Sequence, residues 1–136
     1  EECRSRGNTA ERLEMLRANF NAMIAAGARV VLGTDAGIRP SKTFGSADHH
    51  ELTTYVRLGM SPADAIETGT ARAAELLGLT DVGTLAEGKY ADFLVLDANP
   101  LDDILNTREI SAVYLRGAKL DRDALLAKWK GTNASQ

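Results

Sequence analysis

The chain has 136 residues, of which 44% are hydrophobic and 26% are charged, and its formal net charge is −3 at pH 7. This size and composition are typical of one globular domain. There is no basic excess to bind nucleic acid or an anionic membrane surface, and no apolar run is long enough to span a bilayer. The one cysteine, Cys3, excludes an internal disulfide framework and a cysteine-based zinc cluster.

The first element along the chain is a predicted helix over residues 10–26. Its apolar residues recur at helical spacing and define one face, which we expect to point inward. Asn8 or Thr9 can cap its start, and Gly27 can end it in a left-handed turn. The expected inward side chains are Leu13, Leu16, Phe20, Met23 and Ile24.

The segment after this helix is the most informative stretch of the sequence. Residues 30–37 read Val-Val-Leu-Gly-Thr-Asp-Ala-Gly. The apolar run predicts a strand over 29–34 with its first side chains largely covered, as in a parallel sheet. Ligands of α/β folds bind where such strands end, so Asp35 lies at a candidate site.

Asp35 allows two interpretations from these residues alone. A carboxylate that follows a buried strand needs a partner, a proton or a metal ion. Alternatively, Asp35 closes an Asx-type turn by bonding the backbone of Ala36 and Gly37. The local pattern is short and favours neither interpretation.

A loop over residues 36–47 comes next and contains Gly37 and Arg39. Loops of this length are often functional. Arg39 could anchor a substrate carboxylate, although a solvated charge is the interpretation that we favour. His49 and His50 open the following helix and point in different directions, so they make a poor metal chelate. We expect one histidine to be exposed and the other to cap the helix or line the loop.

The middle of the chain predicts helices first and strands afterwards. Ser61 before Pro62 marks a capped helix start, with Asp64 at the capping-box position. Apolar, β-favouring runs bounded by turn residues then indicate strands and a hairpin. The predicted helices cover 48–58, 62–68 and 71–77, the predicted strands cover 92–96 and 111–116, and the hairpin return lies at 119–120.

The C-terminal residues predict one more amphipathic helix. It begins at Asp121 or Arg122 and reaches Trp129. We expect Leu125, Leu126 and Trp129 to face inward. The residues from Gly131 onward are expected to form a frayed tail.

Several short motifs follow one another in a specific order, although each is weak alone. They are Leu-Gly-Thr-Asp-Ala-Gly (32–37), Glu-Leu with Leu-Gly-Met-Ser-Pro-Ala-Asp-Ala-Ile (51–66), Thr-Ala-Arg-Ala-Ala-Glu-Leu-Leu-Gly-Leu (70–79), Gly-Thr-Leu-Ala-Glu-Gly-Lys-Tyr-Ala-Asp-Phe-Leu-Val-Leu-Asp (83–97), Asn-Pro-Leu-Asp-Asp-Ile (99–104) and Val-Tyr-Leu-Arg-Gly (113–117). Together they resemble the metal-dependent amidohydrolases, in particular the imidazolonepropionase-like and Xaa-Pro dipeptidase-like branch. The resemblance covers nearly the whole chain from Leu13 onward.

The resemblance implies an α/β architecture of which this chain is the C-terminal portion. Residues 1–79 would be the C-terminal part of a (β/α)8 TIM barrel, with its last strand at 29–35. Residues 80–120 would be C-terminal strands of an accessory β-sandwich, and residues 121–136 a C-terminal helix and tail. Without the neighbouring strands, we expect the chain to expose unusual apolar surface.

The resemblance also implies a catalytic role for Asp35. The family aspartate at this position holds a divalent metal, here expected to be one or two zinc ions, and moves a proton from the activated water to the leaving nitrogen. The implied substrate is a dipeptide or a small or cyclic amide, bordered by Gly37, Arg39 and His49. Only Asp35 matches a family metal ligand, so we expect the chain alone to be inactive.

Two other interpretations compete with the enzyme. A non-catalytic α+β interaction module around residues 80–130 would explain the missing ligands, but not the Gly-Thr-Asp-Ala-Gly sequence. Phosphate binding at 33–37 is disfavoured because the glycine spacing fits neither the dinucleotide nor the P-loop fingerprint. The sequence does not decide the compartment, for which we favour the cytoplasm, or whether the protein is a homo-oligomer.

Overall fold

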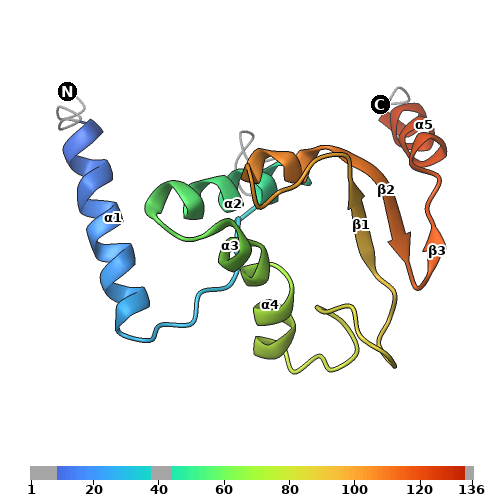
Figure 1. Cartoon of the computed structure of the whole chain (residues 1–136). Coiled ribbons are helices and arrows are strands. Elements are labelled where there is room, and N and C mark those ends of the chain that lie inside the picture. Colours follow the sequence, from blue (N-terminus) through green and yellow to red (C-terminus); the bar gives the residue numbers. More distant parts are fainter. Residues whose placement is uncertain (1–8, 38–43, 134–136) are drawn as a thin grey trace.

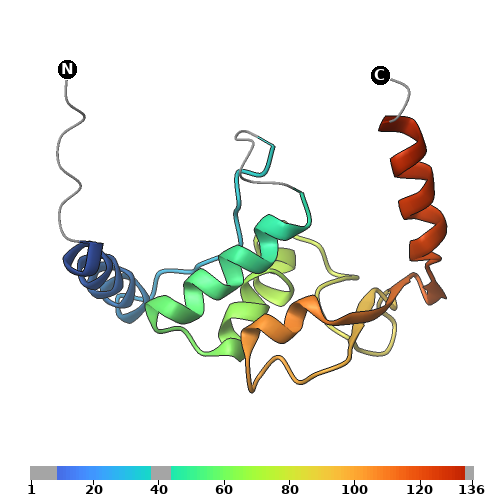
Figure 2. The same ribbon diagram turned by 90° about the horizontal axis from the view of Figure 1, so that it is seen from above.

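The computed structural model describes residues 9–37 and 44–133, in which helices are combined with one small sheet. The elements are α1 Thr9–Ala25, α2 Ser46–Leu58, α3 Pro62–Thr68, α4 Ala71–Leu76, β1 Phe93–Leu96, the 3₁₀ helix η1 Ile104–Arg108, β2 Ile110–Leu115, β3 Ala118–Lys119 and α5 Arg122–Asn133. Helix α1 stands to one side, α2 to α4 form the centre, and the strands and α5 lie on the other side (Figures 1 and 2). This mixture fits the predicted α/β class. No helix in the two described ranges is long and apolar enough to cross a bilayer.

The predicted helices are confirmed, and their ends follow the expected local signals. Gly27 and Gly59 end α1 and α2 with left-handed φ angles of 83° and 114°. The Ser61 hydroxyl accepts a hydrogen bond from the Asp64 backbone N–H at 3.1 Å, which caps α3. The predicted helix 71–77 ends one residue earlier, at Leu76.

The strand predicted over residues 29–34 is wrong, because this segment forms no ladder with any described strand. The backbone N–H of Leu32 donates instead to the carbonyl of Thr68, the last residue of α3, at 3.0 Å. Val30, Val31 and Leu32 are therefore half-buried rather than largely covered. A β-favouring run becomes a strand only where another strand can satisfy its backbone groups.

The apolar faces of the first and last helices are also more exposed than predicted. On α1, Leu13 and Phe20 are half-buried, whereas Leu16, Met23 and Ile24 are exposed. The expected inward residues of α5 are all exposed, at 55% for Leu125, 50% for Leu126 and 70% for Trp129. Helical periodicity identifies an apolar face, but it does not supply the surface that covers it.

The end of α5 differs from the prediction as well. The expected frayed tail from Gly131 is wrong for its first residues, because α5 continues to Asn133. Exposed large hydrophobic side chains on both outer helices agree with the expectation that this chain leaves apolar surface uncovered.

The sheet is antiparallel, in the order β1-β2-β3. Arg116 and Gly117 connect β2 to β3 with φ angles of 50° and 79°, as a two-residue type I′ hairpin requires. The Asp92 carboxylate accepts a hydrogen bond from the Arg116 backbone N–H and so fixes this turn from the start of β1. Phe93 lies opposite Tyr114, and their rings stack with centroids 4.5 Å apart. The predicted strands and hairpin are thus confirmed.

The buried core is small and lies mostly among α2, α3, α4 and η1. Tyr55 is its one aromatic member in the described ranges, and its ring stacks on Phe20 of α1 with centroids 5.7 Å apart. Near this stack, Arg17 and Asn21 of α1 donate to carbonyls in the last turn of α2. The buried side chains are Ala47, Tyr55, Ala65, Thr68, Ala74, Ile104, Thr107 and Ala112.

Candidate functional site

Asp35 lies at the end of the irregular segment, in a left-handed backbone conformation with φ of 49°. Aspartate tolerates this conformation better than most residues, but it still costs on the order of 1 kcal/mol. The turn is closed by Thr34, whose hydroxyl accepts a hydrogen bond from the Ala36 N–H at 3.2 Å. The Asp35 carboxylate makes no hydrogen bond to the Ala36 or Gly37 N–H among the described residues, so the predicted Asx turn is not present.

The Asp35 side chain is exposed, which differs from the buried carboxylate expected after a covered strand. No strand pairs with this segment in the described ranges, so no sheet covers the carboxylate. In the described ranges, no group of three or more His, Cys, Asp or Glu side chains is placed to hold a metal ion. Because a catalytic zinc ion needs about three protein ligands, Asp35 can serve only as one member of a larger ligand set.

The loop predicted to border the substrate is described at its two ends only. Gly37 has φ of 87°, and a Cβ atom at this position would lie 2.8 Å from Cζ of Phe44. The Phe44 ring, which is 82% exposed, therefore lies directly on the Gly37 backbone. Arg39 lies outside the described residues, so its suggested contact with a substrate stays a prediction.

His49 packs against η1 rather than extending freely into solvent. Its Nδ1 lies 3.0 Å from the Thr107 hydroxyl, which donates its one hydrogen to the Ile104 carbonyl at 2.8 Å. Nδ1–H is therefore the donor to Thr107. Burial and the nearby Arg108 lower the pKa of His49, while Asp48 opposes that shift. His50 is exposed, as expected for one of the pair.

The backbone that leads to Asp35 is held by Tyr55 of α2. The Tyr55 hydroxyl donates to the Val31 carbonyl at 3.2 Å. Burial, followed by the charge and hydrogen bonding of Glu51, raises the pKa of Tyr55, while a backbone hydrogen bond from Gly33 opposes that shift. Sequence reasoning missed this contact. The available signal was a phenolic hydroxyl on an otherwise apolar helix face, since such a group needs a partner when buried.

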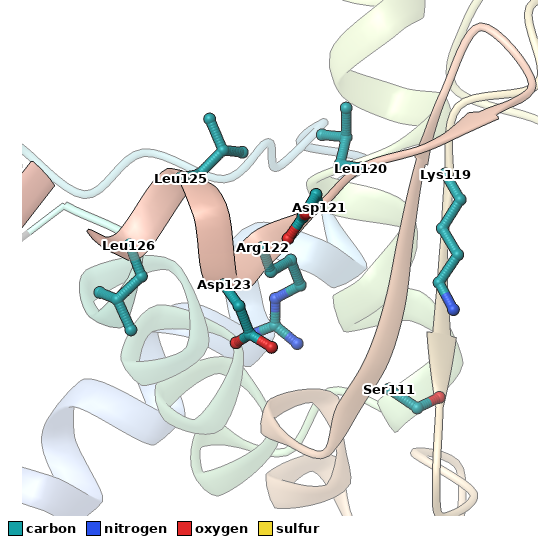
Figure 3. A pocket seen from close by; sticks show the side chains of 8 residues that line it. All are labelled: Ser111, Lys119, Leu120, Asp121, Arg122, Asp123, Leu125 and Leu126. Carbon is teal, nitrogen blue, oxygen red and sulfur yellow. The ribbon is translucent and has the colours of Figure 1, made fainter. Parts of the chain in front are cut away.

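A groove with a volume of about 850 Å³ lies between the sheet and the start of α5, as Figure 3 shows. Two of its charged side chains have structural partners: Arg122 donates to the Ile110 carbonyl, and the Asp121 carboxylate caps α5 through the Ala124 N–H at 2.9 Å. The groove is far from the Asp35 segment in both overall views (Figures 1 and 2). We therefore regard the Asp35 segment, rather than this groove, as the candidate functional site.

Comparison with known families identifies the class of protein. The model of the amidohydrolase family matches residues 7–123, which include Asp35 and all of the sheet. The chain therefore belongs to the amidohydrolase family, and the resemblance inferred from the ordered motifs is confirmed.

Individual relatives agree with this family. The chain is 38% identical over 102 residues to an imidazolonepropionase of Deinococcus radiodurans, covering 72% of this chain and 25% of that protein. Its fold is similar to phenylurea hydrolase B, with a TM-score of 0.71 and 36% identity over 79% of this chain and 27% of the other. It also resembles a Xaa-Pro dipeptidase with methionine bound in the active site, with a TM-score of 0.68 and 28% identity over 76% and 25% of the two chains. The chain thus spans about a quarter of the length of each of these relatives.

Proposed function

We propose that this chain is the C-terminal part of a metal-dependent amidohydrolase that cleaves C–N bonds of small substrates such as dipeptides or cyclic amides. The observation that carries this proposal is Asp35, an exposed carboxylate on a left-handed residue within the stretch that matches the family. Strained backbone at the end of a segment is a common feature of functional sites. The similarity to an imidazolonepropionase and to a Xaa-Pro dipeptidase supports the substrate class.

Asp35 is proposed to act as a metal ligand and as the proton carrier of the reaction. A bound divalent ion, which we propose to be zinc, would polarise the scissile carbonyl and activate water. The Asp35 carboxylate accepts a proton from the attacking water and returns it to the leaving nitrogen, which is a poor leaving group unless protonated. The other ligands would come from parts of the enzyme beyond this chain, so the chain alone would be inactive.

The proposed division of the chain follows the family resemblance. Residues 1–79 would complete a TIM barrel, residues 80–120 would join further strands in a β-sandwich, and residues 121–136 would form the C-terminal helix and tail. Two features support this division. The outer face of α1 carries exposed apolar side chains, and β1 has β2 as its one sheet partner in the described ranges.

The test is turnover by the full-length enzyme that contains this chain. Asp35→Asn keeps the size of the side chain but removes its charge and its proton-accepting capacity. We expect turnover on a panel of dipeptides and cyclic amides to fall on the order of a hundredfold or more, because proton transfer contributes about that much. Melting temperature and metal content are recorded for each variant.

Asp92→Asn is the matched control, since it makes the same chemical change at the hydrogen bond to Arg116. This variant should lose stability, by about 1 kcal/mol, and keep its turnover per folded molecule. Near-normal turnover of Asp35→Asn at normal metal occupancy would contradict the proposal. It would favour the alternative of a non-catalytic α+β interaction module.

A further inference from the structure

One peptide group in the segment before Asp35 is bonded on both sides by helices. The carbonyl of Val31 accepts from the Tyr55 hydroxyl of α2, and the N–H of Leu32 donates to the Thr68 carbonyl at the end of α3. These two polar groups belong to the same planar peptide unit, so its position and its orientation are both fixed. In a sheet, neighbouring strands would make these bonds, whereas here a side chain and a helix end make them.

Each of the two helical partners is itself held in place. Tyr55 is 8% exposed, and its ring stacks on Phe20, which leaves the hydroxyl little freedom. Thr68 is fully buried, and its hydroxyl donates to the Ala65 carbonyl at 2.6 Å. The Leu32 side chain also packs closely on Gly69, where a Cβ atom would lie 3.2 Å from Cδ2 of Leu32.

We propose that Tyr55 is a positioning residue, which sets the placement of the Asp35 carboxylate by holding the Val31–Leu32 peptide through its hydroxyl. This role rests on the proposed function of Asp35. Only Gly33 and Thr34 separate the held peptide from Asp35, and the Thr34 hydroxyl tightens the turn by accepting from Ala36. A shift of the peptide is therefore passed on to the carboxylate, and small misplacements of a catalytic group reduce turnover strongly.

Tyr55→Phe in the full-length enzyme tests the hydroxyl alone, because phenylalanine keeps the ring stacked on Phe20. We expect kcat to fall by about three- to tenfold, the factor that one neutral hydrogen bond represents, with KM nearly unchanged. Hydrogen exchange in residues 31–36 should accelerate by about the same factor, while exchange in α2 stays as in the parent enzyme. A role in packing alone would leave both kcat and this local exchange unaltered.

Tyr114→Phe is the matched control. It removes a hydroxyl from a ring that is likewise stacked, on Phe93, but lies in the sheet. This variant should keep the parent kcat and the parent exchange in residues 31–36. Equal losses in both variants would overturn the positioning role, and so would a Tyr55→Phe enzyme with parent kcat and parent exchange.

Gly69→Ala tests the same peptide from its other side and keeps the question open if Tyr55→Phe does not fold. Its methyl group must move Leu32 by a few tenths of an ångström. We expect a lower kcat and faster exchange in residues 31–36, and parent values of both would contradict the proposal. Asp35→Asn separates the two hypotheses. Normal turnover of that variant refutes the role of Asp35, whereas an inactive Asp35→Asn beside a fully active Tyr55→Phe refutes only the role of Tyr55.

Discussion

The segment before Asp35 and the β1–β2 pair are both apolar, β-favouring runs, but only the second forms a sheet. Phe93 and Leu94 find Tyr114 and Val113 as partners within the chain, and the ladder forms. Val31 and Leu32 find no strand in the described ranges and bond to α2 and α3 instead. A β-favouring run thus allows a strand to form, but the strand forms only where a second strand is available to pair with it.

The largest expected effect comes from Gly83, which lies between α4 and the sheet in sequence and packs on the start of α4. Its φ is 85°, and a Cβ atom would lie 2.6 Å from Cβ of Ala74 and 3.0 Å from the Thr70 carbonyl oxygen. Gly83→Ala must push α4 away from the segment that leads to the sheet. We expect the free energy of unfolding to fall by about 3 kcal/mol, which combines overpacking with left-handed strain.

Gly88→Ala provides the control for this prediction. Gly88 has a similar φ of 83°, but a Cβ atom there would have no neighbour within 4 Å. It should therefore cost only the backbone strain, about 1 kcal/mol. Denaturant unfolding of both full-length variants measures the difference. Equal costs would mean that the close packing of Gly83 on α4 does not contribute to stability.

A smaller effect is expected from two serines, one at the start of α3 and one in the sheet. Ser61→Ala removes the N-cap of α3 and should cost about 1 kcal/mol. Ser111→Ala removes an exposed hydroxyl that donates to the Val95 carbonyl across the sheet, at 3.2 Å. Because β1 and β2 stay paired by their backbones, this second change should cost less, about 0.5 kcal/mol. Thermal melts measure both costs. A larger loss of stability for Ser111→Ala than for Ser61→Ala would contradict the view that backbone pairing mainly stabilises the sheet.

The smallest effect is the pH dependence of the contact between α2 and η1. The pKa of His49 is lowered in the fold by burial and by Arg108, so the folded chain binds this proton less readily than the unfolded chain. The stability that depends on neutral His49 is complete above the unfolded pKa of about 6.5, and it is lost as pH falls from there through the lower folded value. At pH values below both the unfolded and the folded pKa, this contribution to stability is fully lost and no longer changes with pH.

His49→Asn measures this contribution, since asparagine can still donate to Thr107 but does not titrate. Between about pH 7 and pH 5, the melting temperature of the parent enzyme should fall further than that of this variant. His50→Asn, at the exposed neighbouring position, should behave as the parent does. Identical pH profiles for the parent and His49→Asn would contradict the assignment.

The parts of the fold that sequence could predict are those with local causes. The cap at Ser61, the left-handed ends at Gly27 and Gly59, and the hairpin turn at Gly117 each depend on a few neighbouring residues. The strand at 29–34 was mispredicted because pairing is a non-local property. Helical periodicity identified the apolar faces of α1 and α5. It could not predict that they are exposed, because exposure depends on whether another part of the protein covers them.

The candidate site could be predicted only in part for a similar reason. Asp35 could be predicted as a site residue because its motif is continuous in sequence, and its role stays a prediction. Closure of its turn by Thr34 was missed, since Thr and Asp both form such turns and the pattern does not distinguish them. The contact from Tyr55 was missed because it joins residues 24 positions apart, and no local pattern marks it.

The held Val31–Leu32 peptide also determines the order in which the site can assemble. Both of its partners come later in the chain, Tyr55 by 24 positions and Thr68 further still. During synthesis the Asp35 turn therefore leaves the ribosome before these two partners, and the Val31–Leu32 peptide is held on both sides only when α3 has folded. The contacts of Tyr55 and Thr68 with this peptide close long loops, so they should form more slowly during folding than the local hairpin turn at Arg116 and Gly117. The proposed catalytic carboxylate is therefore set in place by residues that are made after it.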